Sequence, residues 1–315
     1  MQYDEFRAMN SHILVGADGE SALVEAGFKE VRAFIAESEA RFTRFSQDSE
    51  LSQLNRTSGG WFIASEPLYE VVLQARRLMD LTCGLFDPSI IRALRRAGYD
   101  RSMDEIRTAG ALPERSVDWP ELVTTGFAAV EFKPEIRAIH LPRDVQIDLG
   151  GIAKGWIAEQ AANVLAPYAR GCAVSAGGDI YFNGLPDGEN TWPVAFEDPR
   201  NPDQSPATLR VRGGGVVTSS ITLRRWVQGQ QERHHIIDPR TGEPAVTDWL
   251  SVTVAAPHTW VAEAFAKAIL IAGSQQAQTI ADRSHDIEFL GFKQDGSLWG
   301  SSHAKELLSV TGQLI

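Results

Sequence analysis

Helical and strand-like patterns follow one another along this chain in an irregular order, and this order limits the fold more than any other feature. Apolar residues recur at helical spacing over 20–41 and 67–79, whereas strand-like segments lie between residues 129 and 301. A doubly wound parallel sheet would require strands and helices in regular alternation. We therefore predict an α+β fold with a mainly antiparallel sheet core and flanking helices. The expected strands are 129–133, 137–141, 145–149, 172–177, 193–198, 208–219, 251–257, 287–292 and 297–301, and the further helices are 152–169, 260–272 and 275–283.

Residues 88 to about 122 are rich in Arg, Asp and Glu and are predicted to form a helical insertion. No segment of the chain has the composition of a clean interdomain linker. Its 315 residues, 43% of them hydrophobic, are enough for one large core. We therefore expect residues 1–315 to form a single domain that carries a helical side lobe.

The charge of the chain excludes some partners. With 30 Lys and Arg against 41 Asp and Glu, the net charge is −11, so no broad basic surface is available to nucleic acid. The first twenty residues lack the basic and apolar regions of an export signal. The longest apolar stretches, such as 261–273, are short and carry charges. We expect a cytoplasmic chain with no membrane span, no nucleic-acid partner and only a local site for phosphate.

The densest cluster of chemically suggestive residues is 147-IDLGGIAKGW-156. A strand is expected to end near Asp148, and Gly150 and Gly151 allow a close approach of the backbone. The following helix is expected to start near Lys154. Free N–H groups at a helix start, beside a lysine, form a compact anion site. A tight turn with a solvated lysine explains the same residues about equally well.

Two other turns have both a structural and a functional interpretation. In 174-VSAGGDIYFNG-184 a strand enters a Gly-Gly-Asp turn, which fits a ligand lying against the backbone or simply a β-hairpin. In 84-GLFDPSI-90 a carboxylate follows an aromatic ring, but Asp87 is also a good N-cap for a helix with Pro88 at its first position. The hairpin and the cap need no ligand, and neither excludes one.

Titratable residues gather in two later segments. His235 lies in 233-RHHIIDPRTGEP-244, where an imidazole can act as a general base or contact a phosphate. The adjacent His234 would point to the other side of a strand, so the pair is a weak metal site. Glu263 and Lys267 are four residues apart on an expected helix. They form either an ordinary surface ion pair or, since their neighbours are apolar or small, part of a pocket.

Taken in order along the chain, these segments resemble the bacterial flavin transferase (ApbE) family. The resemblance begins at Met9-Asn10-Ser11, where the family has Met-Gly-Thr, and ends in the helix that contains 262-AEAFAK-267. Each string alone is weak, but the whole set in sequence order is specific. The segments in between are 42-FTRFSQDSELSQLN-55, 84-GLFDPSI-90, 147-IDLGGIAKGW-156, 174-VSAGGDI-180, 235-HIIDPRTGEP-244 and 251-SVTV-254.

The resemblance implies an ApbE-like fold and FAD:protein FMN transferase activity. Such enzymes use FAD as substrate, pass FMN to a Thr or Ser hydroxyl of an acceptor protein and release AMP. Glycine-rich backbone, a helix N-terminus and a divalent cation suit the two phosphates, and aromatic slots suit the rings. Two alternatives on the same scaffold stay open. One is an FAD pyrophosphatase that gives FMN and AMP, and the other is an FAD-binding protein without catalysis.

By position, the resemblance also implies roles for single residues. His235 is expected to handle a proton or orient a phosphate. The carbonyl of Gly151 and the carboxylate of Glu263 are expected to ligate Mg²⁺. The residues expected to contact FAD or lie near it are Met9, Phe45, Phe86, Asp87, Asp148, Lys154, Ser219, Ile236 and Lys267.

One departure from the family pattern concerns the metal. The family helix reads Ala-Asp-x-x-x-Thr, and its Asp and Thr bind Mg²⁺, whereas this chain has Glu263 and Lys267 at those positions. A glutamate can still ligate a hard cation. An ammonium group has no lone pair to offer. Mg²⁺ is therefore the expected metal, with Lys267 in place of its usual Thr ligand and able to bring its own charge to the diphosphate.

Overall fold

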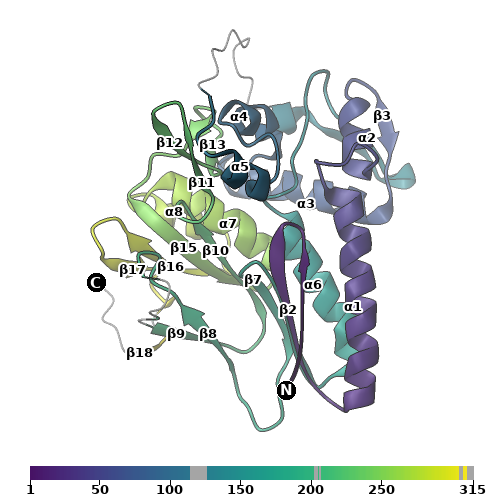
Figure 1. Ribbon diagram of the computed structural model, residues 1–315, viewed down its shortest axis with the longest axis vertical. Coiled ribbons are helices and arrows are strands. Elements are labelled where there is room, and N and C mark those ends of the chain that lie inside the picture. Colours follow the sequence, from purple (N-terminus) through teal and green to yellow (C-terminus); the bar gives the residue numbers. More distant parts are fainter. Residues whose placement is uncertain (114–125, 202–204, 206, 305–307, 311–315) are drawn as a thin grey trace.

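The computed structural model describes residues 1–113, 126–201, 205, 207–304 and 308–310. Its largest element is an eight-stranded sheet in which every neighbouring pair is antiparallel (Figure 1). The predicted α+β class with a mainly antiparallel core is thus confirmed. In spatial order the strands are β1 (Gln2–Ala8), β2 (Ser11–Asp18), β6 (Gly171–Ala176), β7 (Asp179–Gly184), β10 (Gly214–Ser220), β15 (Trp249–Ala256), β16 (Glu288–Lys293) and β17 (Leu298–Gly300).

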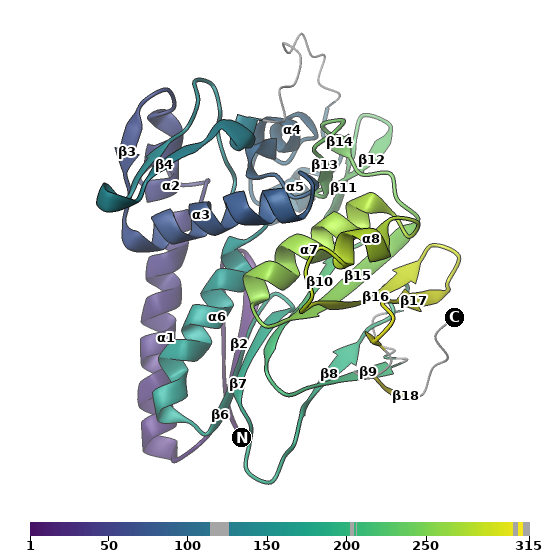
Figure 2. The same cartoon turned by 180° about the vertical axis from the view of Figure 1, so that it is seen from behind.

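Helices cover one face of this sheet. The helices α6 (Ala153–Leu165) and α7 (Thr259–Ala272) pack on its central strands, and α1 (Ser21–Phe42) packs on α6 (Figure 2). Phe42 of α1 contacts the buried Trp156 of α6 edge to face, with ring centroids 5.6 Å apart. Burial of this apolar layer is the main force that holds α6 and α7, and hence their N-termini, in place. The helices predicted at 20–41, 152–169 and 260–272 are confirmed.

A small second sheet covers part of the opposite face. It consists of β8 (Trp192–Phe196), β9 (Ala207–Val211) and β18 (Leu308–Val310). Phe196 stacks on Phe292 of the large sheet at 4.7 Å between centroids. Because side chains alternate along a strand, Val216 of β10 packs on this side and Val217 packs on the helical side. The single strand expected over 208–219 is wrong, since Gly214 (φ +86°) begins a new strand after a turn.

The segment 145–149 is extended but is no strand, which corrects the prediction. Its alternating burial resembles a strand, yet its backbone has no neighbouring strand to pair with. Instead the side chain of Asn55 donates to the carbonyl of Ile147 and accepts from its N–H, at 2.9 and 2.8 Å. The N–H of Asp148 donates to the carbonyl of Pro88 at 2.8 Å. These bonds fix the chain just before α6 without any sheet.

Over 88–113, the part of the predicted insertion that the structure describes, the chain forms three short helices that pack as a side lobe. Trp226 from a neighbouring hairpin is buried against it, and its indole N–H donates to the carbonyl of Ala97 at 2.7 Å. Residues 114–122 of the predicted insertion lie outside the described residues. The lobe contains η1 (Pro88–Ile90), α4 (Ile91–Arg96) and α5 (Met103–Ala109), and beside it lie β11 (Arg225–Gln228), β12 (Gln231–His234), β13 (Ile237–Asp238) and β14 (Glu243–Pro244).

The remaining elements complete the helical side. In α3 (Glu66–Leu81) the hydroxyl of Ser65 caps the N-terminus and Pro67 lies in the first turn, as the sequence predicts. No helix among the described residues is long and apolar enough to cross a membrane. The other elements are α2 (Glu50–Arg56), β3 (Trp61–Ile63), η2 (Gly126–Ala129), β4 (Glu131–Lys133), η3 (Pro134–Ile136), β5 (Ala138–His140), η4 (Ala166–Tyr168) and α8 (Ala277–Ala281).

Candidate active site

A cavity of about 390 Å³ lies between the side lobe, the start of α6 and the middle of α7. This volume is within the usual range for small-molecule sites. It brings together residues from position 9 to position 271, which are far apart in sequence. Of the residues expected at the site, those that line the cavity are Met9, Phe45, Phe86, Asp87, Asp148, Gly151, Lys154, His235, Ile236 and Lys267.

Two of the expected residues do not line the cavity. Ser219 is buried within β10, where it pairs with Val252 of β15. Its expected place beside a ligand is therefore not supported by its position. Glu263 is also absent from the cavity wall, because its side chain is fully buried behind those of Lys154 and Lys267.

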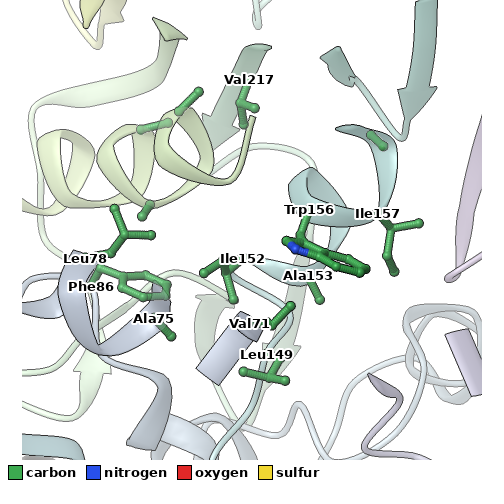
Figure 3. Packing of buried hydrophobic residues seen from close by; sticks show 14 of the residues in the cluster. Val71, Ala75, Leu78, Phe86, Leu149, Ile152, Ala153, Trp156, Ile157 and Val217 are labelled. Atoms are coloured by element: carbon green, nitrogen blue, oxygen red, sulfur yellow. The ribbon is translucent and has the colours of Figure 1, made fainter. Parts of the chain in front are cut away.

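Phe86 forms a rigid wall of the cavity. Its N–H donates to the hydroxyl of Thr82 at 3.1 Å, and its ring lies beside Leu78 and Ala75 of α3 (Figure 3). The next residue, Asp87, caps η1 by accepting from the N–H and hydroxyl of Ser89 at 2.7 and 2.6 Å. The predicted cap is thus confirmed. Burial raises the pKa of the Asp87 carboxyl, although the Ser89 bonds oppose this effect.

The turn before α6 packs closely around Gly151. A Cβ atom there would lie 3.0 Å from Cε2 of Phe86 and 3.4 Å from Cε of Lys267. A side chain at this position would crowd both neighbours, which glycine avoids. Asp148, at the start of this turn, lies 3.3 Å from Nε of Arg44. The Arg44 guanidinium also covers the ring of Phe45, which is 48% exposed at the cavity mouth.

Two lysines and two carboxylates form a buried cluster at the cavity floor. The ammonium groups of Lys154 and Lys267 lie 3.0 and 3.1 Å from the same oxygen, Oε1, of Glu263. The other oxygen of Glu263 accepts from the N–H of Gly155 at 2.9 Å. Lys154 also pairs with Asp179, which follows the Gly-Gly hairpin turn between β6 and β7. The predicted hairpin is confirmed, and the Glu263–Lys267 pair belongs to a pocket rather than to the surface.

The charges of this cluster depend on one another. Burial opposes ionisation of Glu263, but the ammonium groups of Lys154 and Lys267 and the N–H of Gly155 outweigh it and lower the pKa to about 2. Burial also lowers the pKa of Lys267, against the attraction of Glu263. For Lys154 the carboxylates of Asp179 and Glu263 outweigh burial, so its pKa is raised. Glu263 is therefore a carboxylate at neutral pH.

His235 lies at the cavity wall just after β12. Burial lowers the pKa of its imidazole well below 6.5, and the nearby charges of Arg224 and Lys267 lower it further. The imidazole is therefore neutral at pH 7 and can accept a proton. Its Nδ1 atom is buried without a hydrogen-bond partner among the described residues. The adjacent His234, the last residue of β12, instead contacts the carbonyl of Ala245 at 3.2 Å, so the two rings have different surroundings.

The expected Mg²⁺ ligands do not fit a divalent cation in this arrangement. One oxygen of Glu263 already binds two ammonium groups, the other binds an N–H, and the side chain has no exposed atom. The aliphatic part of Lys267 lies against Gly151, whose carbonyl is the second expected ligand. Among the residues that the structure describes, no three His, Cys, Asp or Glu side chains are grouped to hold a metal.

Sequence reasoning missed Arg224 and Asp179 as members of the site. Arg224 lines the cavity, and within the described part of the chain its guanidinium has no hydrogen bond or ion pair. It lies between Ser219 and the segment 233–244, both of which the sequence analysis singled out, and this position was the available signal. Asp179 was part of a noted turn, but its pairing with Lys154 depends on the tertiary fold.

Comparisons with known proteins agree with this geometry. The chain is 30% identical over 277 residues to a protein of Treponema pallidum (strain Nichols) named FAD:protein FMN transferase, covering 82% of this chain and 74% of that one. A Vibrio cholerae protein of the same name is 26% identical over 287 residues, covering 89% of this chain and 84% of that one.

Solved structures share the fold. The crystal structure of the ApbE protein of Thermotoga maritima has a TM-score of 0.80 at 24% identity and covers 97% of this chain and 99% of that one. The flavin transferase ApbE from Vibrio cholerae has a TM-score of 0.75 at 22% identity, with 97% and 98% covered. The sequence model of the ApbE family matches residues 9–290. The chain therefore belongs to the ApbE family.

Proposed function

We propose that this chain is an FAD:protein FMN transferase, which moves FMN from FAD to a Thr or Ser hydroxyl of an acceptor protein and releases AMP. The observation that carries the proposal is a single cavity with an aromatic, glycine-lined wall, a cationic floor and a neutral imidazole. Its lining extends from Met9 to Ile271, so the proposal treats the chain as one ApbE-like domain. Relatives named for this activity support it.

The chemistry divides among the residues as follows. Met9, Phe45 and Phe86 are apolar surfaces for the flat rings, and Ile236 extends them. Asp87 and Asp148 offer carboxylates for hydroxyl groups of the substrate. The cationic side chains Lys154, Arg224 and Lys267 bind the diphosphate. The sequence resemblance suggested each of these residues except Arg224. We add Arg224 because it lines the cavity.

The reaction forms one bond and breaks one. The acceptor hydroxyl oxygen attacks the phosphorus of the FMN half, and the bond from that phosphorus to the bridging oxygen breaks. AMP leaves with the bridging oxygen, and the hydroxyl proton passes to the neutral imidazole of His235. Fixed positive charge stabilises the negative charge that develops on the leaving phosphate.

Mass spectrometry of the products tests the proposal. The protein is incubated with FAD and an acceptor domain that carries a candidate Thr, with AMP measured in parallel. The proposal predicts an FMN adduct on the acceptor and an equal amount of AMP. AMP with free FMN would indicate the pyrophosphatase instead, and bound FAD that stays intact beside a competent acceptor would contradict catalysis.

A histidine pair provides the matched control. His235→Gln should lower kcat/KM for adduct formation about 10²- to 10⁴-fold, the usual contribution of a general base. His285→Gln changes an exposed histidine outside the cavity and should leave the rate unchanged. Equal rates for both variants would remove His235 from the mechanism.

A further inference from the structure

We propose that the Lys267 ammonium is the built-in cation of the diphosphate site, so that FAD binds with its phosphates paired to this side chain, together with Lys154 and Arg224, and without a divalent metal ion. The inference rests on the proposed function, since it assumes that FAD occupies the cavity. It goes beyond that function because it assigns the neutralising charge to a residue of this chain.

The position of Lys267 is the first support. Its side chain is 17% exposed and contributes to the cavity wall, whereas Glu263 behind it is completely buried. The aliphatic part of the same side chain lies against Gly151, and its ammonium binds the Glu263 carboxylate. Lys267 therefore contacts both residues between which a metal ion would have to bind.

The electrostatic balance is the second support. Within the cluster, the ammonium groups of Lys154 and Lys267 neutralise the carboxylates of Asp179 and Glu263. A divalent cation on Glu263 would lie close to two ammonium groups that already contact its Oε1 within 3.1 Å, and such like charges repel strongly in a site shielded from water. An anionic ligand would instead be attracted, because Arg224 adds a further positive charge at the cavity wall.

The anchoring of Lys267 is the third support. Its ammonium is held by Oε1 of Glu263 at 3.1 Å and lies 3.4 Å from the carbonyl oxygen of the same residue. An ammonium group has three donors, so at least one remains for a phosphate oxygen. A cation held before the substrate arrives requires little reorganisation during binding.

Binding measured in two media tests the inference without relying on turnover. FAD and riboflavin are titrated into the protein at constant ionic strength, once with EDTA and once with Mg²⁺. Riboflavin serves as the matched ligand because it has the ring system but no phosphate. The wild type should bind FAD with the same Kd in both media, within about twofold.

Three variants of one residue sharpen the test. Lys267→Met should weaken FAD binding in EDTA about 10- to 100-fold, as expected for the loss of a charge-assisted hydrogen bond, and should leave riboflavin binding unchanged. Lys267→Arg keeps the charge and should retain most of the FAD affinity. Lys267→Thr gives a hydroxyl ligand and removes one of the two ammonium groups from Oε1 of Glu263, so Mg²⁺ should restore part of its FAD binding. Lys29→Met, an exposed site on α1 away from the cavity, is the charge control.

Several results would overturn the inference, and they differ from a failure of the proposed function. Wild-type FAD binding that requires Mg²⁺ would contradict it, and so would an unchanged Kd for FAD in Lys267→Met. Equal losses of FAD and riboflavin affinity would assign Lys267 a structural role only. A wild-type protein that binds neither flavin would instead reject the proposed function. Circular dichroism and the unfolding midpoint of each variant show that it is folded.

Discussion

Two buried glutamates on neighbouring helices perform the same structural task in different electrostatic surroundings. Glu263 of α7 accepts from the N–H of Gly155 in the first turn of α6, at 2.9 Å. Glu159 of α6 accepts from the N–H of Thr259, the first residue of α7, also at 2.9 Å. Each helix thus provides the carboxylate for the N-terminus of the other, where N–H groups lack partners and negative charge is favourable.

The two glutamates differ in what their second oxygen contacts. Oε1 of Glu159 lies 2.8 Å from Nδ1 of His258, which is half exposed, and burial raises the pKa of this carboxyl. Oε1 of Glu263 binds the ammonium groups of Lys154 and Lys267, and its pKa is lowered to about 2. A glutamate can therefore accept a hydrogen bond from a helix N-terminus without a lysine beside it. Of the two helix ends compared, the one that borders the cavity is the one whose glutamate binds lysines, which associates these lysines with ligand binding.

Removal of the charge on Glu263 should produce the largest effect. Glu263→Gln leaves two ammonium groups with only Asp179 as a carboxylate partner, and loss of one member of a buried ionic cluster costs about 3–5 kcal/mol of unfolding free energy. Urea denaturation at pH 7 measures the loss. Glu159→Gln keeps an acceptor for Thr259 and should cost clearly less. An equal cost for the two variants would mean that both glutamates act only as caps.

The close approach of the two helices should be the next most sensitive feature. A Cβ atom at Gly155 would lie 2.8 Å from the carbonyl oxygen of Thr259, and backbone cannot move aside as a flexible side chain can. Gly155→Ala should therefore cost about 1–3 kcal/mol despite the better helix propensity of alanine. In Gly60→Ala the nearest atom is 3.4 Å away, so this control should change stability little. A neutral Gly155→Ala would show that the helices are farther apart than described.

The pH dependence of stability should have opposite signs at the two glutamates. The folded pKa of Glu263 is lowered, so its contribution is fully present above 4.5 and is lost as the pH falls toward about 2. The folded pKa of Glu159 is raised, so the folded protein binds this proton more readily than the unfolded chain. The free energy of unfolding contributed by Glu159 therefore rises as the pH falls through that pKa. Denaturation of both Gln variants from pH 7 downwards measures each contribution by difference. If the Glu263 and Glu159 contributions changed with pH in the same direction, the electrostatic surroundings assigned to the two glutamates would be wrong.

Loss of Lys267 should have the smallest effect on stability. In Lys267→Met the Glu263 carboxylate keeps Lys154 and the N–H of Gly155 as partners, and burial of the Lys267 ammonium outweighs its attraction to Glu263, since the pKa of Lys267 is lowered. The unfolding free energy should therefore fall by only about 1 kcal/mol, the net contribution of one hydrogen bond, while FAD affinity falls. Thermal and urea unfolding measure the first quantity. A large loss of stability would make Lys267 part of the scaffold and would erase the contrast between the two helix ends.

The sequence was sufficient for the fold class because local patterns decide it. The helix over 152–169 and the strands over 172–177 and 251–257 follow from periodicity and lie where expected. The segment 145–149 was wrongly predicted as a strand because an alternating pattern does not reveal whether a neighbouring strand is present. Here the side chain of Asn55 forms the hydrogen bonds that a neighbouring strand would form. The hairpin of β1 and β2 was missed because the first residues were searched only for an export signal and for the first family motif. In the structure the residues of β1 alternate between half-buried and exposed.

The site was predictable to the extent that family motifs mark it. Motif positions identified most of the cavity wall, including Phe86, Lys154 and His235. They could not reveal that Glu263 turns away from the cavity toward Gly155, or that Asp179 completes the charge balance of Lys154. These features depend on the packing of α6 against α7, which no local pattern encodes. Ser219 lies outside the cavity wall for the same reason, because the register of β10 buries it.

A crystal structure of the FAD complex, grown with Mg²⁺ present, tests the central claim most directly. The account predicts diphosphate oxygens within hydrogen-bond distance of the Lys267 ammonium, with Glu263 still bound to Lys154 and Gly155. A Mg²⁺ ion coordinated by Glu263 and the Gly151 carbonyl, with Lys267 displaced from the diphosphate, would contradict it.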